Sequence, residues 1–148
     1  MQSCQFTFAV HVMAVLALKK DQCCSSTKLA MTVNTNPVVI RRLLIDLQEA
    51  NLIWTERGPA GGACLAKKPE KITLLEIYRA VNPRDMFGGH PKQPSQQCPV
   101  GREIPRVMDN LRQRITQAKE RELKRITLAT VLRELGCTAT GLAAGTPR

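Results

Sequence analysis

The segment from residue 36 to residue 51, N-P-V-V-I-R-R-L-L-I-D-L-Q-E-A-N, constrains the fold more than any other part of the chain. The side chain of Asn36 is suited to capping a helix, and Pro37 fits the first helical position, where its missing N–H costs nothing. Asn51 is expected to end the helix, because Asn tolerates the left-handed conformation that closes many helices. The segment therefore predicts a helix with well-marked ends.

The two faces of this helix differ in character. At helical spacing one face is entirely apolar, and the opposite face carries two arginines between two β-branched residues. The apolar face comprises Ile40, Leu43, Leu44 and Leu47, and the opposite face comprises Val38, Arg41, Arg42 and Ile45. The second face is typical of a helix-turn-helix recognition helix, whose N-terminal residues meet base edges in the major groove. The simpler alternative is a surface helix in which Arg42 pairs with Asp46.

The preceding residues favour the recognition helix over a plain surface helix. Ser26 can cap a short helix over residues 27–33, in which Leu29, Ala30 and Val33 would face inward. Asn34 and Thr35 then supply a turn. A short helix, a tight turn and a second helix together form the helix-turn-helix unit.

The segment over residues 6–18 is apolar along nearly its whole length. It is too short to span a bilayer and suits a buried helix, so we expect it to be the central core helix. His11 lies inside this segment. We expect a hydrogen-bonded structural histidine rather than a metal ligand, because no second ligand lies three or four residues further on.

Two short segments after the recognition helix, residues 52–55 and 63–66, predict a β-hairpin. A hairpin directly after a helix-turn-helix is a wing. Its turn carries Arg57 and three glycines, Gly58, Gly61 and Gly62. These glycines have no core to fill, so we expect them to let the backbone and Arg57 approach a phosphate or a minor groove. A nucleotide-binding phosphate loop is the alternative, but the motif G-x-x-x-x-G-K-[ST] is missing.

The second half of the chain begins with a capping box, Thr73 to Glu76, which predicts a helix that ends before Pro83. We expect a winged helix-turn-helix over residues 1–82, a loop or sensor segment over 83–102, dimerisation helices over 103–136 and a flexible tail over 137–148. The long helix carries one apolar stripe: Ile104, Met108, Leu111, Ile115 and Ala118. Such a stripe outside a compact domain needs a partner, and a second copy of the chain is the simplest one.

The charge balance narrows the class of partner. Lys and Arg number 22 against 12 Asp and Glu, a formal net charge of +10, which favours a polyanionic partner. Aromatic residues are only 3% of the chain, which argues against a single-strand binder built on stacking platforms. No apolar run is long enough to span a membrane, and the N-terminus lacks a secretion signal. We therefore expect a cytoplasmic protein that binds no membrane.

The 6 cysteines are scattered, and 148 residues can build a core without disulfides, so we expect reduced thiols. Cys23 and Cys24 are adjacent and lack the two-residue gap of a redox motif. An enzyme with a cysteine nucleophile would need a nearby base, and the only histidines are His11 and His90. We expect no enzymatic activity.

Three groups of residues together resemble a known family: Leu43-Leu44 with Leu52, the wing run R-G-P-A-G-G, and I-T-L-L-E-I followed by Ala80-Val81. From about residue 3 to residue 135 the chain is similar to the Rrf-two family of winged-helix bacterial transcription regulators. That family includes an iron-sulfur cluster regulator, a nitric-oxide-sensing repressor and a cysteine-metabolism repressor. Two positions depart from it: Ala60 replaces a glycine and Ala63 a tyrosine found in many members.

The resemblance implies a mainly α fold with a small β-hairpin, that is, a winged helix-turn-helix with a long dimerisation helix. It also implies a homodimer that reads DNA with the helix of Arg41 and Arg42 and contacts phosphate or a minor groove with the wing. Cluster-binding members place three cysteines in the sensor segment, whereas this chain has Cys98 there, with His90 upstream. An iron-sulfur cluster needs several thiolates, so we expect no cofactor and no metal.

Cys98 is a candidate thiol sensor. It precedes Pro99 at the start of the long helix, and a helix N-terminus favours the thiolate. An ordinary loop cysteine is the alternative. Among the other cysteines, Cys64 in the wing strand is the main competitor as a sensor, because modifying it would disturb a DNA contact directly.

The sequence thus predicts a regulator that binds specific double-stranded DNA, as a homodimeric repressor responding to a redox or small-molecule signal. The residues expected to contact DNA are Thr27, Asn36, Val38, Arg41, Arg42, Ile45, Arg57, Gly58, Gly61 and Gly62. Those expected at the dimer interface are the five residues of the apolar stripe. The alternative is a winged-helix protein-protein interaction module without specific DNA binding.

Overall fold

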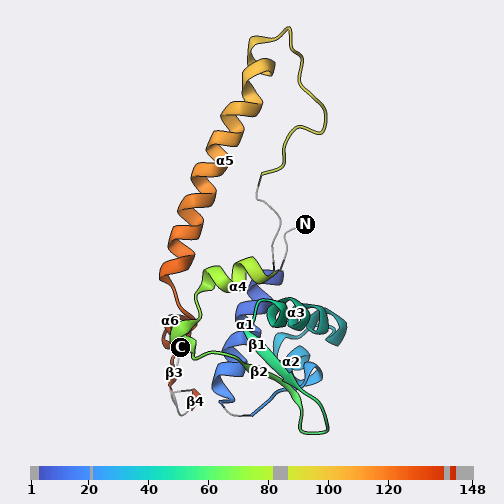
Figure 1. Ribbon diagram of the computed structural model, residues 1–148, viewed down its shortest axis with the longest axis vertical. Helices are drawn as coiled ribbons and strands as arrows, with labels where there is room; N and C mark the ends of the chain where they lie inside the picture. Colours follow the sequence, from blue (N-terminus) through green and yellow to red (C-terminus); the bar gives the residue numbers. More distant parts are fainter. Residues whose placement is uncertain (1–3, 21, 82–86, 139–140, 143–148) are drawn as a thin grey trace. The chain divides into compact units, whose positions relative to one another are not determined.

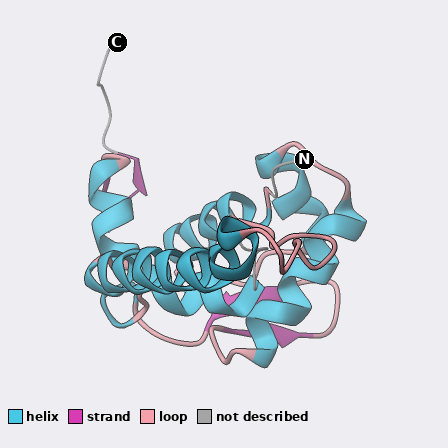
Figure 2. Cartoon of the chain, turned by 90° about the horizontal axis from the view of Figure 1, so that it is seen from above, coloured by secondary structure: helices cyan, strands magenta, loops and turns pink. Residues whose placement is uncertain are grey.

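The computed structural model describes residues 4–20, 22–81, 87–138 and 141–142. The chain divides into two compact units, of which unit 1 comprises Met1–Pro83 and Leu123–Arg148 and unit 2 comprises Arg84–Glu122. The described part of the chain is mostly helical, with short β-hairpins (Figures 1 and 2). The predicted fold class is therefore confirmed.

Unit 1 contains most of the elements. In chain order they are α1 (Gln5–Leu18), α2 (Ser26–Val33), α3 (Pro37–Glu49), β1 (Ile53–Glu56), β2 (Gly62–Leu65), a 3-10 turn η1 (Pro69–Lys71), α4 (Leu74–Val81), α6 (Leu128–Glu134), β3 (Cys137–Thr138) and β4 (Gly141–Leu142). Strands β1 and β2 pair antiparallel, and so do β3 and β4. The long helix α5 (Pro99–Arg125) forms most of unit 2.

The core of unit 1 is built around α1, as predicted. Val12 and Met13 are fully buried, and α1 packs against α2, α3, α4 and α6. His11, however, is exposed and lines an open groove with Phe6 and Val10. The expected buried histidine is therefore wrong. Because α1 is apolar on nearly every side, its sequence does not indicate which face turns outward.

The ends of the helix-turn-helix are marked by local contacts. The Oδ1 of Asn36 accepts a hydrogen bond from the N–H of Val38 at 2.9 Å. Asn34 and Asn51 both take positive φ, at 61° and 60°, and so close α2 and α3. The cap of α2 is Ser25, whose Oγ accepts from the N–H of Lys28 at 3.3 Å, rather than Ser26 as predicted. Two adjacent serines can each cap a helix, and the sequence does not distinguish them.

The wing is tied to the helix-turn-helix by a short backbone bridge. Cys24 donates its N–H to the carbonyl of Ala63 at 2.9 Å, and Ala63 donates its own to the carbonyl of Cys24 at 2.8 Å. The segment before α2 thus pairs with β2, beside the pairing of β1 with β2. Each strand of the hairpin is displaced by one residue from the prediction.

The last helix, α6, belongs to unit 1. The expected division instead grouped it with the long helix. Thr127 forms a β-bridge with Thr73, and Leu128 is fully buried in the core. The N–H of Leu74 donates to the carbonyl of Ile126, and the N–H of Leu128 to that of Ile72, each at 2.8 Å. Each of these contacts joins residues that are some 55 positions apart in the sequence. Most of the predicted tail, residues 83–86 of the predicted loop and the last residue of the predicted winged helix-turn-helix lie outside the described residues.

The long helix begins at Pro99, four residues before the predicted start at Glu103, and contains Pro105. Proline has no N–H to donate to the carbonyl of Gly101, which is the buried residue of α5.

None of the described helices combines the length and the apolar character needed to cross a membrane.

The predicted capping box is present at the start of α4. Glu76 accepts from the backbone N–H of Thr73 at 2.8 Å, and the N–H of Glu76 donates to Oγ1 of Thr73 at 3.2 Å. Lys67 forms an ion pair with Glu76 at 2.7 Å. Desolvation of the carboxyl by itself raises its pKa, but the hydrogen bonds from Lys67 and Thr73 and the charge of Lys67 outweigh it, so the pKa of Glu76 lies below 4.5.

We predict that Glu76→Gln lowers the free energy of unfolding at neutral pH by less than about 1 kcal/mol, because the side chain is 38% exposed and solvent screens the charge. A lowered pKa favours the folded state above the ordinary value of 4.5, and this advantage disappears as the pH falls through the lowered pKa. Urea denaturation of both proteins over the acidic range measures the difference. A difference that stays constant down to the lowest pH would contradict the assignment.

Candidate nucleic-acid interface

The predicted reading face of α3 lies exposed in unit 1. Val38 and Ile45 are 53% and 56% exposed, and Arg41 and Arg42 lie between them in the second turn. The opposite face, with Ile40 and the three leucines of the prediction, is buried. Among the described residues, no ion pair joins Arg42 to Asp46. The guanidinium groups are thus available to a ligand, and the simple surface pair is not formed.

The chemistry of this face suits a base edge in a major groove. A guanidinium group can donate two parallel hydrogen bonds to guanine, and an aliphatic side chain can contact the methyl group of thymine. Arg41 and Arg42 provide the first kind of group, and Val38 and Ile45 provide the second. All four side chains lie on α3, and the burial of the opposite face of this helix fixes the direction in which they point.

The start of α2 offers a second set of polar groups. Thr27 is exposed, as predicted, and so is Lys28, which the sequence analysis missed. A basic residue in the first turn after a capping serine is the signal that could have identified it, since such a side chain can meet a phosphate. Asn36 is also exposed, but its side-chain oxygen already caps α3, which leaves its amide N–H groups for a ligand.

The three glycines of the wing turn have different roles. Gly58 has φ +110°, and a side chain there would meet no atom within 4 Å, so this position and the exposed Arg57 are open to a ligand. A Cβ on Gly61 would collide with the carbonyl oxygen of Glu56, and one on Gly62, which has φ +141°, with the backbone of Cys24. Both glycines therefore make room for backbone of the same chain, which the turn sequence does not reveal, and their contact with DNA stays a prediction.

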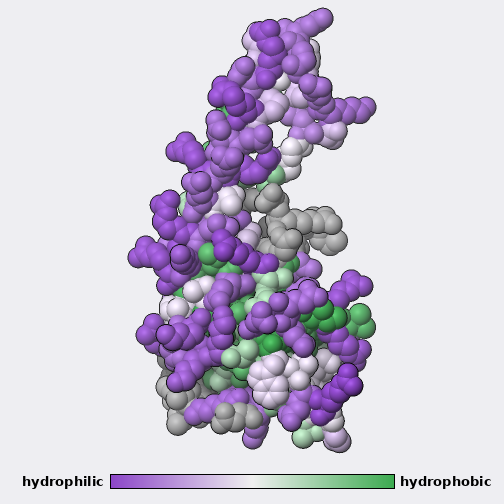
Figure 3. Space-filling view, viewed as in Figure 1, coloured by the Kyte–Doolittle hydropathy of each residue, from purple (hydrophilic) through white to green (hydrophobic). Residues whose placement is uncertain are grey.

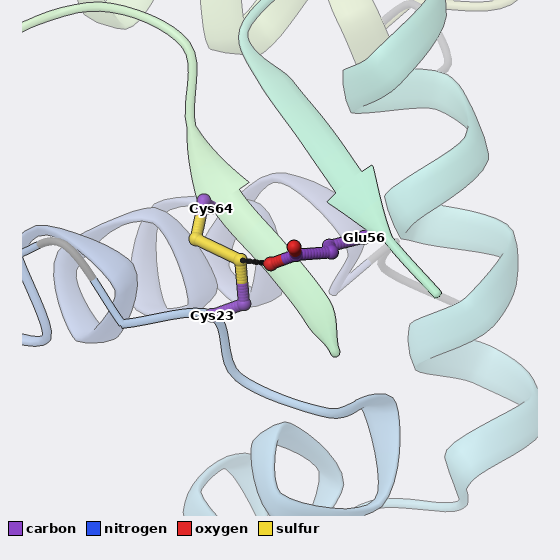
Figure 4. The surroundings of a disulfide bond; sticks show 3 residues. All are labelled: Cys23, Glu56 and Cys64. Carbon is purple, nitrogen blue, oxygen red and sulfur yellow. Dashed lines mark hydrogen bonds between the residues drawn. A yellow bond between two sulfur atoms is a disulfide. The ribbon is translucent and has the colours of Figure 1, made fainter. Parts of the chain in front are cut away.

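Cys23 and Cys64 form a disulfide with a Cα–Cα distance of 4.7 Å (Figure 4). The expectation of reduced thiols is therefore wrong for this pair. The bridge between Cys24 and Ala63 brings the two cysteines together across 41 residues of sequence, which spacing alone does not reveal. The free cysteines among the described residues are Cys4, Cys24, Cys98 and Cys137.

Unit 2 carries the remaining predicted site residues. Cys98 is exposed and directly precedes α5, where its carbonyl accepts the N–H of Arg102 at 3.0 Å. A cavity of about 670 Å³ lies between residues 88–94 and α5, and His90, Ile104 and Met108 line it. Cys98 does not line this cavity.

None of the five residues in the predicted apolar stripe of α5 is fully buried. Ile104, Met108 and Ile115 are half-buried, whereas Leu111, which is 40% exposed, and Ala118 face solvent. Hydrophilic side chains dominate the face of α5 visible in Figure 3. An apolar stripe that the described chain leaves partly uncovered can accept a partner.

Comparison with known proteins identifies the family. The family model described as "Rrf2: Iron-dependent Transcriptional regulator" matches residues 2–134. YwnA of Bacillus subtilis (strain 168), which carries the name of an HTH-type transcriptional regulator, is 38% identical over 128 residues, or 86% of this chain and 93% of the relative.

Solved structures agree with the fold. A crystal structure described as a DNA binding protein superposes with a TM-score of 0.70 at 34% identity, covering 86% of this chain and 98% of that one. The structure of CymR (YrzC), described as the global cysteine regulator of Bacillus subtilis, superposes with a TM-score of 0.62 at 21% identity, covering 90% and 97%. The resemblance found in the sequence is therefore confirmed.

The family description mentions iron, and the described residues do not fit an iron site. They contain no group of three or more His, Cys, Asp or Glu side chains that could hold a metal ion. Cys98 contributes one thiol to the sensor segment, whereas a cluster requires several.

We predict that Gly62→Ala destabilises unit 1 by about 1–3 kcal/mol, because the new methyl group meets the backbone of Cys24 and the residue keeps a positive φ. Gly89→Ala is the matched control, since a Cβ there meets no atom within 4 Å. Chemical denaturation of the two variants measures the difference. Equal stability of both would show that the wing does not pack on the segment before α2 as described.

Proposed function

The chain belongs to the Rrf2 family of transcriptional regulators, and from this premise we propose that it is a cytoplasmic homodimeric repressor of specific double-stranded DNA sites. The observation that carries the proposal is the exposure of Arg41 and Arg42 on a helix whose other face is buried. On this reading α3 enters the major groove, and the side chains that reach base edges are Val38, Arg41, Arg42 and Ile45.

Affinity and specificity come from different groups in this proposal. Thr27 and Lys28 at the start of α2, and Arg57 and Gly58 in the wing turn, are exposed where phosphates would pass. Phosphate contacts position the protein but carry no sequence information. The formal net charge of +10 strengthens all such contacts.

The homodimer is proposed from the pattern on α5. The stripe residues follow one another at alternating intervals of four and three, from Ile104 to Ala118, which is the spacing of a coiled-coil seam. A second copy of α5 would cover them. Two recognition helices held by one dimer would read two half-sites, so that affinity for the full site exceeds that of one unit alone.

We propose that the regulatory signal, an oxidant or a small molecule, acts on the segment that leads into α5. No iron-sulfur cluster takes part in this proposal. Cys98 lies next to the first residue of that helix and is exposed, so an oxidant can reach it. Oxidation would add a polar group or a bridge at the N-terminus of the helix. A shift of about 1.4 kcal/mol between two dimer geometries would change occupancy tenfold. The cavity beside residues 88–94 offers a small molecule an alternative point of action in the same unit.

The proposed function is tested by selecting fragments of the source genome with purified full-length protein at physiological salt. Recovery of fragments that share a two-fold symmetric sequence supports the proposal. Retention of no double-stranded DNA at that salt would reject it in favour of a protein-protein interaction module.

We predict that Arg41→Ala or Arg42→Ala weakens binding to the selected site by roughly 1–3 kcal/mol and relaxes base preference at one position of each half-site. Arg57→Ala is expected to weaken selected and random DNA alike and to reduce the dependence of affinity on salt. Fluorescence anisotropy titrations on both DNAs at several salt concentrations measure these effects. Unchanged discrimination in both helix variants would remove α3 as the reading element.

A second prediction concerns the dimer. Leu111→Asp and Ile115→Asp each place a charge in the proposed apolar seam, which costs several kcal/mol unless the charge reaches water. We expect light scattering to give a monomer mass and DNA affinity to fall. Gln113→Asp adds the same charge to an exposed position off the stripe and is the control. Dimers that persist in both stripe variants would place the interface elsewhere.

A further inference from the structure

The disulfide between Cys23 and Cys64 belongs to unit 1, whereas Cys98 belongs to unit 2. We propose that these two cysteines form a reversible thiol-disulfide site, and that their oxidation raises the affinity of unit 1 for DNA. The second half of this inference rests on the proposed function. The site takes hydroperoxides as oxidants and small thiols or dithiols as reductants.

The location of the pair supports a link to DNA reading. Cys23 lies two residues before Ser25, which caps α2, and Cys64 lies in β2, directly after the wing turn. The bond therefore encloses α2, α3, β1 and the wing turn in one covalent loop. Every residue that the proposed function places against DNA, from Thr27 to Gly58, lies inside this loop.

The backbone keeps the two cysteines adjacent whether or not they are bonded. Cys24 and Ala63 exchange two hydrogen bonds, at 2.9 and 2.8 Å, and each is the chain neighbour of one cysteine of the pair. The Cα–Cα distance of 4.7 Å lies within the range that a disulfide requires. Oxidation therefore needs no rearrangement of the fold, and reduction leaves two thiols ready to react again.

The two sulfur atoms differ in access. Cys23 is half-buried, whereas Cys64 is 4% exposed. In the oxidative direction the Cys23 thiolate attacks a hydroperoxide oxygen, the O–O bond breaks, and a sulfenic acid and an alcohol or water form. The Cys64 thiol then attacks that sulfur and expels water, so two thiols and one hydroperoxide yield one disulfide, one alcohol or water, and one water. In the reductive direction one thiol of a dithiol attacks the Cys23 sulfur and releases Cys64 as a thiol. The second thiol then attacks the mixed disulfide, releases Cys23 as a thiol and leaves the reductant as a disulfide.

Glu56 is a positioning residue that acts on this reaction. Its Oε2 lies 3.7 Å from the Sγ of Cys23, at the end of β1 (Figure 4). In the reduced protein the carboxylate can accept a hydrogen bond from the Cys23 thiol, which favours the protonated form, and its negative charge disfavours a second negative charge on the sulfur. The carboxylate therefore slows oxidation, which keeps the pair reduced until the oxidant concentration rises.

The effect on DNA follows from the loop that the bond closes. In the oxidised protein the wing is held covalently against the start of α2, so Arg57 and Lys28 keep one spacing relative to α3. In the reduced protein the segment before α2 keeps its hydrogen bonds and backbone packing with β2 but has no covalent link to it. Restricting a binding surface to one arrangement reduces the entropy lost on binding. The oxidised form is therefore the tighter binder.

The test uses full-length protein treated with hydrogen peroxide or dithiothreitol. Mass spectrometry measures the fraction of Cys23–Cys64 linked peptide across buffers of different glutathione ratio, and anisotropy measures affinity for the selected fragment at fixed salt. We expect the linked fraction to change within the range of cellular glutathione ratios and the oxidised protein to bind several-fold more tightly. Cys98→Ser should keep both effects, which separates them from the response proposed for Cys98, and Cys23→Ser should abolish the linked peptide and the tighter binding. Glu56→Gln should oxidise faster than wild type, with Glu70→Gln as its control.

Each contrary outcome has a distinct meaning. A bond that stays intact across the whole range of glutathione ratios would be structural and would overturn the redox site. A reversible bond with equal or weaker affinity in the oxidised state would overturn the effect on DNA. Absence of DNA binding in both states would reject the proposed function, while the linked-peptide fraction would still decide the redox site. Reduced wild type needs no substitution, so the test does not depend on the folding of Cys23→Ser.

Discussion

The burial of one face of α3 fixes the geometry on which the other contacts depend. Ile40 and Leu47 are fully buried, and Leu43 and Leu44 are nearly so. Burying a side chain of this size contributes about 1.5–3 kcal/mol, so turning the helix by one residue would forfeit several kcal/mol. That cost holds Arg41 and Arg42 outward. Neither arginine contributes to the core, and their positions follow from the residues behind them.

Local features of the sequence predicted most of unit 1, and contacts between distant segments accounted for the differences. The cap at Asn36, the turn at Asn34 and the capping box at Thr73 each involve residues within a few positions, so they could be read directly. The disulfide of Cys23 with Cys64 joins two segments 41 residues apart, and no local pattern records that pairing. The same holds for Leu128, whose place in the core depends on residues of the first half of the chain.

Two further features escape the sequence for other physical reasons. His11 lies on the outward face of α1, which the sequence does not indicate because α1 is apolar on nearly all sides. Gly61 and Gly62 leave room for backbone of Glu56 and Cys24, a role that the composition of a turn does not show. Close packing of main chain against main chain depends on tertiary structure and produces no periodic pattern in the sequence.

The bridge between Thr73 and Thr127 gives the chain a modular plan. This bridge is accompanied by the hydrogen bonds of Leu74 to Ile126 and of Leu128 to Ile72. These contacts join the two ends of the chain segment that contains unit 2. Lengthening such a closed segment costs little, about 0.6 kcal/mol for each doubling. That insert can therefore be lengthened, shortened or replaced while the core and α3 stay intact. One winged-helix unit can in this way be combined with many different inserted segments.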